Sequence, residues 1–450
     1  MVPVKKNEIY NVEITGITHE GQGVGRIDNF TVFVDGAIEK EEVEIKIIKL
    51  YKSYGVGKLL KILKPSYDRI EPFCEVYKRC GGCSLQHMSK EAGLKFKENL
   101  VRENLKRIGK LEDIEVCDII SMEEPFRYRN KAQYPVRMAK GETQVGFYAK
   151  RSHDIIEGST CEIQHKVSDR IKAIVKDFIV KNNVSVYDET TGKGLMRHVV
   201  TRVGFKTGEV MVVLVLNGKA IPEKGRLIDD LLSEVPEIKS IIINVNKEKT
   251  NVILGRKNIV IYRQDSITDY IDRFKFNISP RSFFQVNPFQ TEALYNKVLE
   301  YAALSGEDTV FDLYCGIGTI SLFLSQKAKK VYGVEVVKEA IEDAKENARI
   351  NGVGNVEFIT GEAEKVLPDM GVKADVVVLD PPRKGCDESL LETLVEIKPS
   401  KVVYVSCNPA TLARDLKYLS EKGFKVDRVQ PVDMFPWTAH VECVVLMSKK

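Results

Sequence analysis

Short apolar runs alternate with helix-length segments throughout the last third of the chain. The apolar runs have the composition of buried strands, and they lie at residues 309–313, 329–337, 355–360, 374–380 and 401–406. An alternation of this kind is typical of βαβ units, in which helices cover both faces of a parallel sheet. This pattern constrains the fold more than any other feature, and it predicts an α/β fold class with a doubly wound parallel sheet.

The first two thirds of the chain follow other patterns. Residues 1–64 read as short strands separated by glycine turns, which predicts a small closed β-barrel of the OB type. Residues 118–280 contain further strand patterns and one helical pattern near residues 168–182, which together indicate an α+β segment. Residues 91–110 have the periodicity of an amphipathic helix. A chain of 450 residues is too long for one ordinary core, so we expect several domains.

Two local clusters of positive charge stand out against a net charge of only +4. Residues 46–64 contain six lysines and no acid, interleaved with Tyr51 and Tyr54. Residues 126–151 contain seven lysines and arginines against one acid, Glu142, with several aromatic residues among them. Lysines can neutralise RNA phosphates and aromatic rings can stack on bases, so both clusters predict contacts with RNA. A solvated strand face is the alternative for residues 46–64.

The cysteines point to metal binding or catalysis. The first ten residues lack the apolar run of a secretory signal, and no apolar stretch is long enough to cross a bilayer. We therefore expect a cytoplasmic protein without a membrane partner, in which the nine cysteines are reduced. Cys74, Cys80 and Cys83 cluster around a Gly-Gly turn, and Cys161 follows much later. Four thiolates can hold either an iron-sulfur cluster or zinc.

A glycine turn follows the strand at residues 309–313 and opens a helix. Gly316 and Gly318 allow the backbone to bend sharply and to approach a ligand closely. Glu335 ends the next strand, where a carboxylate can accept hydrogen bonds from the ribose hydroxyls of an adenosine cofactor. Asp380 ends a later strand and is expected at the same edge of the sheet. A purely structural turn is the alternative interpretation.

Cys407 directly follows the apolar strand at residues 401–406 and precedes a helical pattern that begins near Pro409. The helix dipole and free amides at that point are expected to favour a thiolate. A thiolate at such a position can act as a covalent nucleophile, and covalent catalysis of this kind is often completed by a base that removes a proton. Glu442 stands on an apolar strand, where an ionisable carboxylate is costly, and is the candidate base. A buried packing cysteine and a solvated edge-strand charge are the alternatives.

Five motifs occur in a fixed order along the chain: FFQVNP, DLYCGIGT, LDPPRKG, SCNPATLARD and HVEC. With them the chain resembles the RNA uridine-5-methyltransferase family, a group of class I S-adenosylmethionine-dependent enzymes. The resemblance implies Cys407 as nucleophile and Glu442 as proton acceptor. It implies that S-adenosylmethionine is contacted by Gln285, Tyr314, Glu335 and Asp380, beside the glycine turn at Gly316 and Gly318.

The same resemblance extends to the N-terminal half. The barrel resembles a TRAM domain, and Cys74, Cys80, Cys83 and Cys161 match the 4Fe-4S motif of the 23S ribosomal RNA branch, which is preferred over zinc. The transfer RNA branch typically lacks both features. The implied domains are a barrel (1–64), a central iron-sulfur and RNA-binding α+β domain (65–85 and 118–280) and a Rossmann-like methyltransferase domain (86–117 and 281–450).

The expected function is C5 methylation of a uridine in 23S ribosomal RNA through a covalent cysteine adduct, by a monomer without an obligate protein partner. Three alternatives stay open. The substrate can be transfer RNA, or the chain can be a non-catalytic RNA-binding or ribosome assembly factor on a methyltransferase fold. An amino-group methyltransferase is the third, because Asp380-Pro381-Pro382 is similar to the motif of those enzymes, but Arg383 stands where they carry an aromatic residue.

Overall fold

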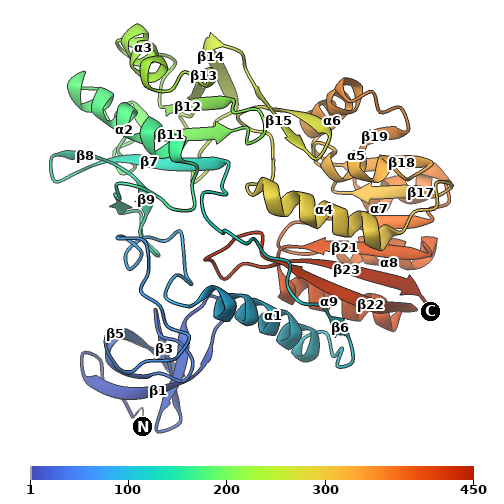
Figure 1. Cartoon of the computed structure of the whole chain (residues 1–450), viewed down its shortest axis with the longest axis horizontal. Coiled ribbons are helices and arrows are strands. Elements are labelled where there is room, and N and C mark those ends of the chain that lie inside the picture. Colours follow the sequence, from blue (N-terminus) through green and yellow to red (C-terminus); the bar gives the residue numbers. More distant parts are fainter. Residues whose placement is uncertain (1–2) are drawn as a thin grey trace.

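A computed structural model describes residues 3–450 (Figure 1). Residues 9–64 form a closed five-stranded barrel with the strand order β1-β2-β3-β5-β4. Its strands are β1 (Ile9–Ile17), β2 (Gly23–Ile27), β3 (Phe30–Val34), β4 (Glu42–Leu50) and β5 (Tyr54–Lys64). Alternate side chains such as Val43, Ile45 and Ile47 fill the interior, because successive residues of a strand face opposite sides. The predicted small barrel is confirmed.

A six-stranded sheet forms the centre of the chain, in the order β14-β13-β12-β11-β7-β8. Its strands are β7 (Lys131–Ala139), β8 (Glu142–Val145), β11 (Met196–Val203), β12 (Val210–Leu216), β13 (Ile238–Val245) and β14 (Lys257–Arg263). The helices α2 (Lys166–Lys181) and α3 (Lys224–Glu234) pack together against one face, and the short strands β9 (Phe147–Tyr148) and β10 (Ile155–Ile156) form a separate pair.

The C-terminal part contains an eight-stranded sheet in the order β19-β18-β17-β20-β21-β23-β22-β6. Five strands run parallel: β17 (Thr309–Leu313), β18 (Lys330–Glu335), β19 (Val356–Thr360), β20 (Val376–Leu379) and β21 (Lys401–Ser406). The antiparallel β23 (Glu442–Lys449) pairs with β21 on one side and with β22 (Phe424–Val432) on the other. This sheet confirms the predicted doubly wound α/β fold.

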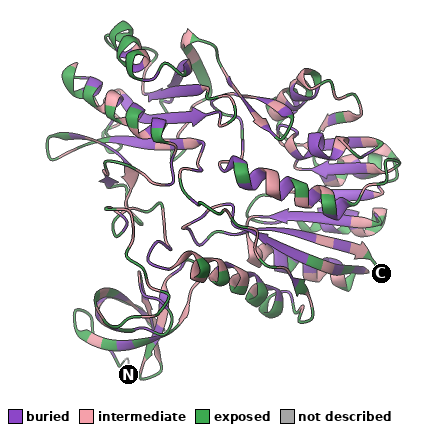
Figure 2. Ribbon diagram, viewed as in Figure 1, coloured by how far each residue is buried: buried purple, intermediate pink, exposed green. Residues whose placement is uncertain are grey.

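Helices cover both faces of this sheet, so its central strands are mostly buried, and exposed residues lie mainly on strands near its edges (Figure 2). One face packs against α4 (Pro288–Ala302), α5 (Thr319–Ser325) and α6 (Lys338–Ile350). The other face packs against α7 (Ala363–Met370), α8 (Glu388–Ile397), α9 (Pro409–Glu421) and the distant α1 (Lys90–Arg107). The short β6 (Glu115–Val116) adds to the sheet edge beside β22, so residues 90–116 lie with the C-terminal sheet although they precede the central sheet.

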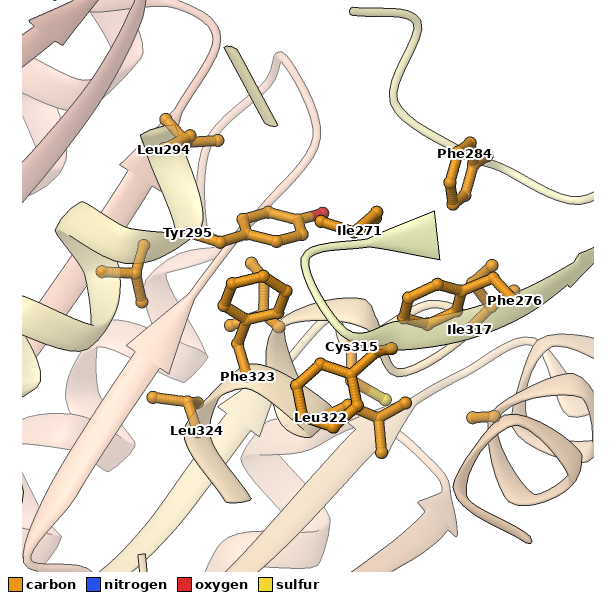
Figure 3. Close-up of a cluster of buried hydrophobic side chains, with 14 of the residues drawn as sticks. Ile271, Phe276, Phe284, Leu294, Tyr295, Cys315, Ile317, Leu322, Phe323 and Leu324 are labelled. Atoms are coloured by element: carbon orange, nitrogen blue, oxygen red, sulfur yellow. The ribbon is translucent and has the colours of Figure 1, made fainter. Parts of the chain in front are cut away.

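The hairpin of β15 (Ile267–Ile271) and β16 (Phe274–Ile278) packs onto the helix that follows the glycine turn. Figure 3 shows Tyr295 of α4 beside Phe323 of α5 in this cluster, and their ring centroids are 5.2 Å apart. Such close packing holds α5 and therefore the turn that precedes it. No helix within residues 3–450 is long and apolar enough to cross a membrane.

Candidate active site and four-cysteine cavity

The predicted site residues gather at one edge of the eight-stranded sheet. Parallel strands end at the same edge, and β17, β18, β20 and β21 end at Leu313, Glu335, Leu379 and Ser406. Tyr314, the glycine turn, Asp380 and Cys407 directly follow these ends. Ligands of doubly wound folds bind at this edge, so the topology brings the candidate cofactor residues and the candidate nucleophile together.

The glycine turn has backbone angles that side chains rarely adopt. Gly316 and Gly318 have φ of 54° and 79°. A Cβ at residue 318 would lie 2.6 Å from the Phe358 ring, whereas no atom lies within 4 Å of a Cβ built at residue 316. Glycine is therefore required at 318 by packing, and Gly316 borders open space on the side where a ligand could approach.

Glu335 fastens this turn to the end of β18. Its carboxylate accepts a hydrogen bond from the Gly316 amide at 3.3 Å and one from the Val337 amide at 2.9 Å. A carboxylate oxygen has a second lone pair, so these bonds leave acceptor capacity for ribose hydroxyls. Gln285 lies on the segment before α4, where the Asn130 side chain donates to its backbone oxygen at 2.8 Å. The Gln285 amide side chain forms no hydrogen bond to the other residues that the structure describes, so it is available to a ligand.

Two aspartates at this edge have raised pKa values. Burial raises the pKa of Asp380 to about 7, and it raises the pKa of Asp312 on β17 to about 7. Ser321 of α5 donates to one Asp312 oxygen at 2.5 Å, while the other oxygen has no partner within residues 3–450. Sequence reasoning missed Asp312, although a carboxylate inside the apolar run TVFDL was a usable signal.

Cys407 and Glu442 lie next to the last residue pair between β21 and β23. Ser406, the last residue of β21, pairs with Cys443, so Cys407 follows this pair at the end of β21 and Glu442 precedes it at the start of β23. The Glu442 carboxylate raises the pKa of Cys407, which places the two groups near each other in the site. Glu442 is 5% exposed. Burial, assisted by the Asp380 carboxylate, raises the pKa of Glu442 to about 8, and the cation of Arg383 acts in the opposite direction.

The expectation that the helix N-terminus favours a Cys407 thiolate is not met in the ligand-free site. Burial, and then the carboxylates of Glu442 and Asp380, raise the pKa of Cys407 to about 11. The α9 helix begins two residues later at Pro409, and its influence is weaker than the cost of burying an anion beside acids. Arg383 lowers the Cys407 pKa. Sequence reasoning considered Arg383 only as a motif mismatch and missed its position beside the thiol.

Cys74, Cys80, Cys83 and Cys161 line one cavity of about 330 Å³, so the structure brings these distant positions together. Within residues 3–450, however, no three side chains of His, Cys, Asp or Glu converge closely enough to hold a metal ion. Burial raises the pKa of Cys83 to about 12 and of Cys161 to about 11, and the neighbouring thiols add to this. Burial therefore disfavours the thiolate form of both groups.

The lysines of the barrel fall into two groups once strand pairing is known. Lys64 donates to Glu42 at 3.4 Å, and Lys61 stands opposite Glu44. Lys46 of β4 stands opposite Lys58 of β5, which places two like charges side by side. Residues 46–64 contain no acid, but Glu42 and Glu44 of β4 lie just before them and stand opposite Lys64 and Lys61. The positive charge available for RNA is therefore smaller than the count of six lysines indicates. In residues 126–151, Arg127, Arg137 and Arg151 are also paired with acids.

Comparisons with known proteins agree with this geometry. A family model described as tRNA (Uracil-5-)-methyltransferase matches residues 97–450, and a TRAM domain model matches residues 3–60. An uncharacterized RNA methyltransferase of Clostridium tetani is 56% identical over 450 residues and covers 99% of this chain and 98% of its own. Another, from Caldanaerobacter subterraneus, is 51% identical over 452 residues and covers 100% of both.

A solved structure is similar over the full length. The Pyrococcus abyssi tRNA (uracil-54, C5)-methyltransferase, in complex with S-adenosyl-L-homocysteine, superposes with a TM-score of 0.79 at 29% identity. The match covers 97% of this chain and 100% of that one. The family model matches most of the chain. This chain belongs to the S-adenosylmethionine-dependent RNA uracil-5-methyltransferase family and carries an N-terminal TRAM domain.

Proposed function

We propose that this protein methylates C5 of a uridine in 23S ribosomal RNA, with Cys407 as covalent nucleophile and Glu442 as general base. The observation that carries the proposal is the position of these two side chains. Cys407 directly follows β21, Glu442 begins the paired strand β23, and the Glu442 charge acts on the Cys407 thiol, all at the sheet edge that also holds the glycine turn, Glu335 and Asp380. A nucleophile and a base next to a cofactor edge are what the reaction needs.

The bond changes follow from the chemistry of uracil. The Cys407 thiol gives its proton to solvent, and a bond forms between its sulfur and C6 as the C5–C6 double bond opens, so that negative charge develops at C5 and O4. S-adenosylmethionine, when bound at this edge, would supply an electrophilic methyl group for C5 and would leave as S-adenosylhomocysteine. The Glu442 carboxylate then removes the C5 proton, the bond between C6 and sulfur breaks, and Cys407 leaves as a thiolate. Arg383 is suited to stabilise the sulfur anion both before it attacks C6 and after it leaves C6, because its cation lowers the Cys407 pKa.

The choice of ribosomal RNA rests on the four-cysteine cavity, together with the resemblance to the ribosomal branch. By its name, the Pyrococcus abyssi neighbour acts on transfer RNA. Its match covers 97% of this chain and therefore includes the barrel. The barrel therefore does not by itself separate the two branches, and transfer RNA is the second candidate substrate. Mapping 5-methyluridine in both RNA classes, from cells with and without the gene, separates the two.

We also propose that the four-cysteine cavity accommodates a 4Fe-4S cluster. Four sulfurs around zinc lie roughly 3.8 Å apart, because each zinc-sulfur bond is about 2.3 Å. The four cysteines line a cavity of about 330 Å³, which has room for a group larger than a single ion. The Gly82 amide donates to the Cys80 sulfur at 3.4 Å, a kind of bond that stabilises cluster sulfurs. Anaerobically purified protein should contain iron and sulfide and be brown, whereas colourless protein with stoichiometric zinc would contradict the cluster.

The catalytic assignment is tested with two variants. Cys407→Ala should abolish both methyl transfer and covalent capture of RNA. Glu442→Gln should still attack and methylate but then stall, so a protein-RNA adduct should persist through denaturing electrophoresis. If Cys407→Ala methylates RNA at the wild-type rate, the covalent mechanism is wrong and the amino-group alternative becomes the leading one.

A further inference from the structure

The loop between β22 and β23 (residues 433–441, the base loop) leads directly into Glu442. Among residues 3–450, no side-chain hydrogen bond fixes the Glu442 carboxylate itself, so its direction depends on the backbone that carries it. Trp437 within the loop has φ of 66°, a left-handed angle that is strained for a side chain of this size. Such a conformation persists only where surrounding contacts hold it.

Those contacts come from parts of the chain more than a hundred residues away. Lys97 of α1 forms a buried ion pair with Asp433 and donates to the Phe435 oxygen at 3.0 Å. Tyr128 donates to the Pro436 oxygen at 3.0 Å, and the Trp437 indole donates to the Pro125 oxygen at 2.9 Å. All these bonds hold the first half of the base loop.

The second half of the base loop is held by the cysteine loop (residues 80–84). The amides of Ser84 and Leu85 both donate to the Trp437 oxygen at 3.0 Å. The Ala439 amide donates to the Ser84 hydroxyl at 2.9 Å, three residues before Glu442. Tyr77 donates to the Ser84 backbone oxygen at 2.7 Å, so all three polar groups of Ser84 are engaged.

Ser84 thus connects two parts of the molecule. The preceding residue, Cys83, lines the four-cysteine cavity, while the Ser84 side chain binds the base loop. We propose that Ser84 is a positioning residue that holds the base loop so that the Glu442 carboxylate meets the C5 proton. The inference rests on the proposed role of Glu442. It gives the cysteine loop a task in the reaction, because the position of Cys83 determines the position of the Ser84 hydroxyl.

The test compares three variants with wild type. Ser84→Ala removes the acceptor for the Ala439 amide, and Ser84→Thr retains a hydroxyl at the same place. Ser168→Ala is the matched control, because its hydroxyl is buried and bonded to Thr201 at 2.7 Å in the central domain. Each is assayed with the RNA class that the mapping experiment identifies. The readouts are methyl turnover, the fraction of enzyme held as a denaturant-resistant RNA adduct, and hydrogen exchange of residues 433–441.

Glu442 acts after methyl transfer, so Ser84→Ala should slow the removal of the C5 proton. If the barrier to this step rises by ~1.4 kcal/mol, turnover should fall about tenfold. The adduct fraction should rise, exchange of residues 433–441 should accelerate, and the KM for S-adenosylmethionine should stay unchanged. Ser84→Thr should restore turnover, and Ser168→Ala should behave as wild type. Turnover that falls equally in Ser84→Ala and Ser168→Ala, or an adduct fraction that does not rise, overturns the positioning role. A wild-type enzyme that forms no adduct overturns the covalent mechanism instead.

Discussion

At the scale of single residues, the site is a set of acids that burial keeps from ionising easily. Glu442 has its pKa raised to about 8, and Asp380 and Asp312 have theirs raised to about 7. A general base works best when its pKa lies near the working pH, and a Glu442 pKa of about 8 meets this condition. The same burial raises the pKa of the Cys407 thiol. Burial therefore disfavours the thiolate that attacks C6, although it raises the pKa of the base that removes the C5 proton.

The pH dependence of Glu442 gives a first prediction. The carboxylate must be ionised to remove the C5 proton, so product release should increase with pH and level off above about 8. Single-turnover measurements of adduct decay across pH check this. A rate of adduct decay that is flat between roughly pH 6 and 9 would contradict the raised pKa.

The same raised pKa predicts a stability effect. Between the ordinary value of 4.5 and about 8, the folded protein keeps a proton on Glu442 that the unfolded chain has lost. The contribution of this proton to the free energy of unfolding is fully present below pH 4.5 and is lost as the pH rises through about 8. Glu442→Gln should therefore stabilise the protein relative to wild type at high pH and not at low pH. Urea unfolding of both proteins at several pH values isolates this residue from Asp380 and Asp312.

Arg383 carries a third residue-scale prediction. Because its cation lowers the Cys407 pKa, Arg383→Met should reduce the thiolate fraction and slow alkylation of Cys407 by iodoacetamide, by about threefold. Lys384→Met is the matched control, since Lys384 is the next residue and is paired with Asp387. Peptide mass spectrometry follows Cys407 separately from the other cysteines. Equal alkylation rates in the two variants would show that Arg383 does not act on the thiol.

At the scale of elements, the two glycines of the turn have different roles: Gly318 is required by packing, and Gly316 borders the proposed ligand space. Gly318→Ala should lower the free energy of unfolding by about 2–4 kcal/mol, because its Cβ meets the Phe358 ring at a strained φ. Gly316→Ala meets no atom and should cost about 1 kcal/mol for backbone strain alone. It should still weaken S-adenosylmethionine binding about tenfold or more, because the methyl group fills the proposed ligand space. Thermal unfolding and calorimetric titration of both variants measure the two effects.

The elements also show how far the sequence determined the result. Apolar runs and glycine turns are local patterns, so the parallel strands, the barrel and the positions of Gly316, Gly318 and Cys407 were predictable. Pairing between distant segments is not local. The contact of Ser84 with Ala439, and the acids opposite Lys61 and Lys64, depend on strand register and loop packing that no short pattern encodes. Asp312 was missed although its buried strand could have revealed it.

At the scale of the whole molecule, the barrel is attached through a buried contact as well as by the chain. Arg69 donates to the fully buried Glu41 of the barrel at 2.5 Å, and Ile38 packs against Leu85 and Met88 beside the cysteine loop. Removing residues 1–64 would expose this surface, so deletion would confuse RNA binding with stability. Surface substitutions on the intact chain are the better test of the barrel.

The last prediction concerns the unpaired lysines of that barrel. Lys46 and Lys58 stand opposite each other, and like charges in this position repel unless an anion lies between them. A phosphate of RNA would relieve the repulsion, whereas Lys64 already has Glu42 as its partner. The double variant Lys46→Gln and Lys58→Gln should therefore bind RNA more weakly. Its slope of log affinity against log salt should fall by about 0.7 to 0.9 for each lost contact. Lys64→Gln, the control, should keep the wild-type slope. Fluorescence anisotropy at several potassium chloride concentrations measures all three proteins, and an unchanged slope in the double variant would mean that these lysines only face solvent.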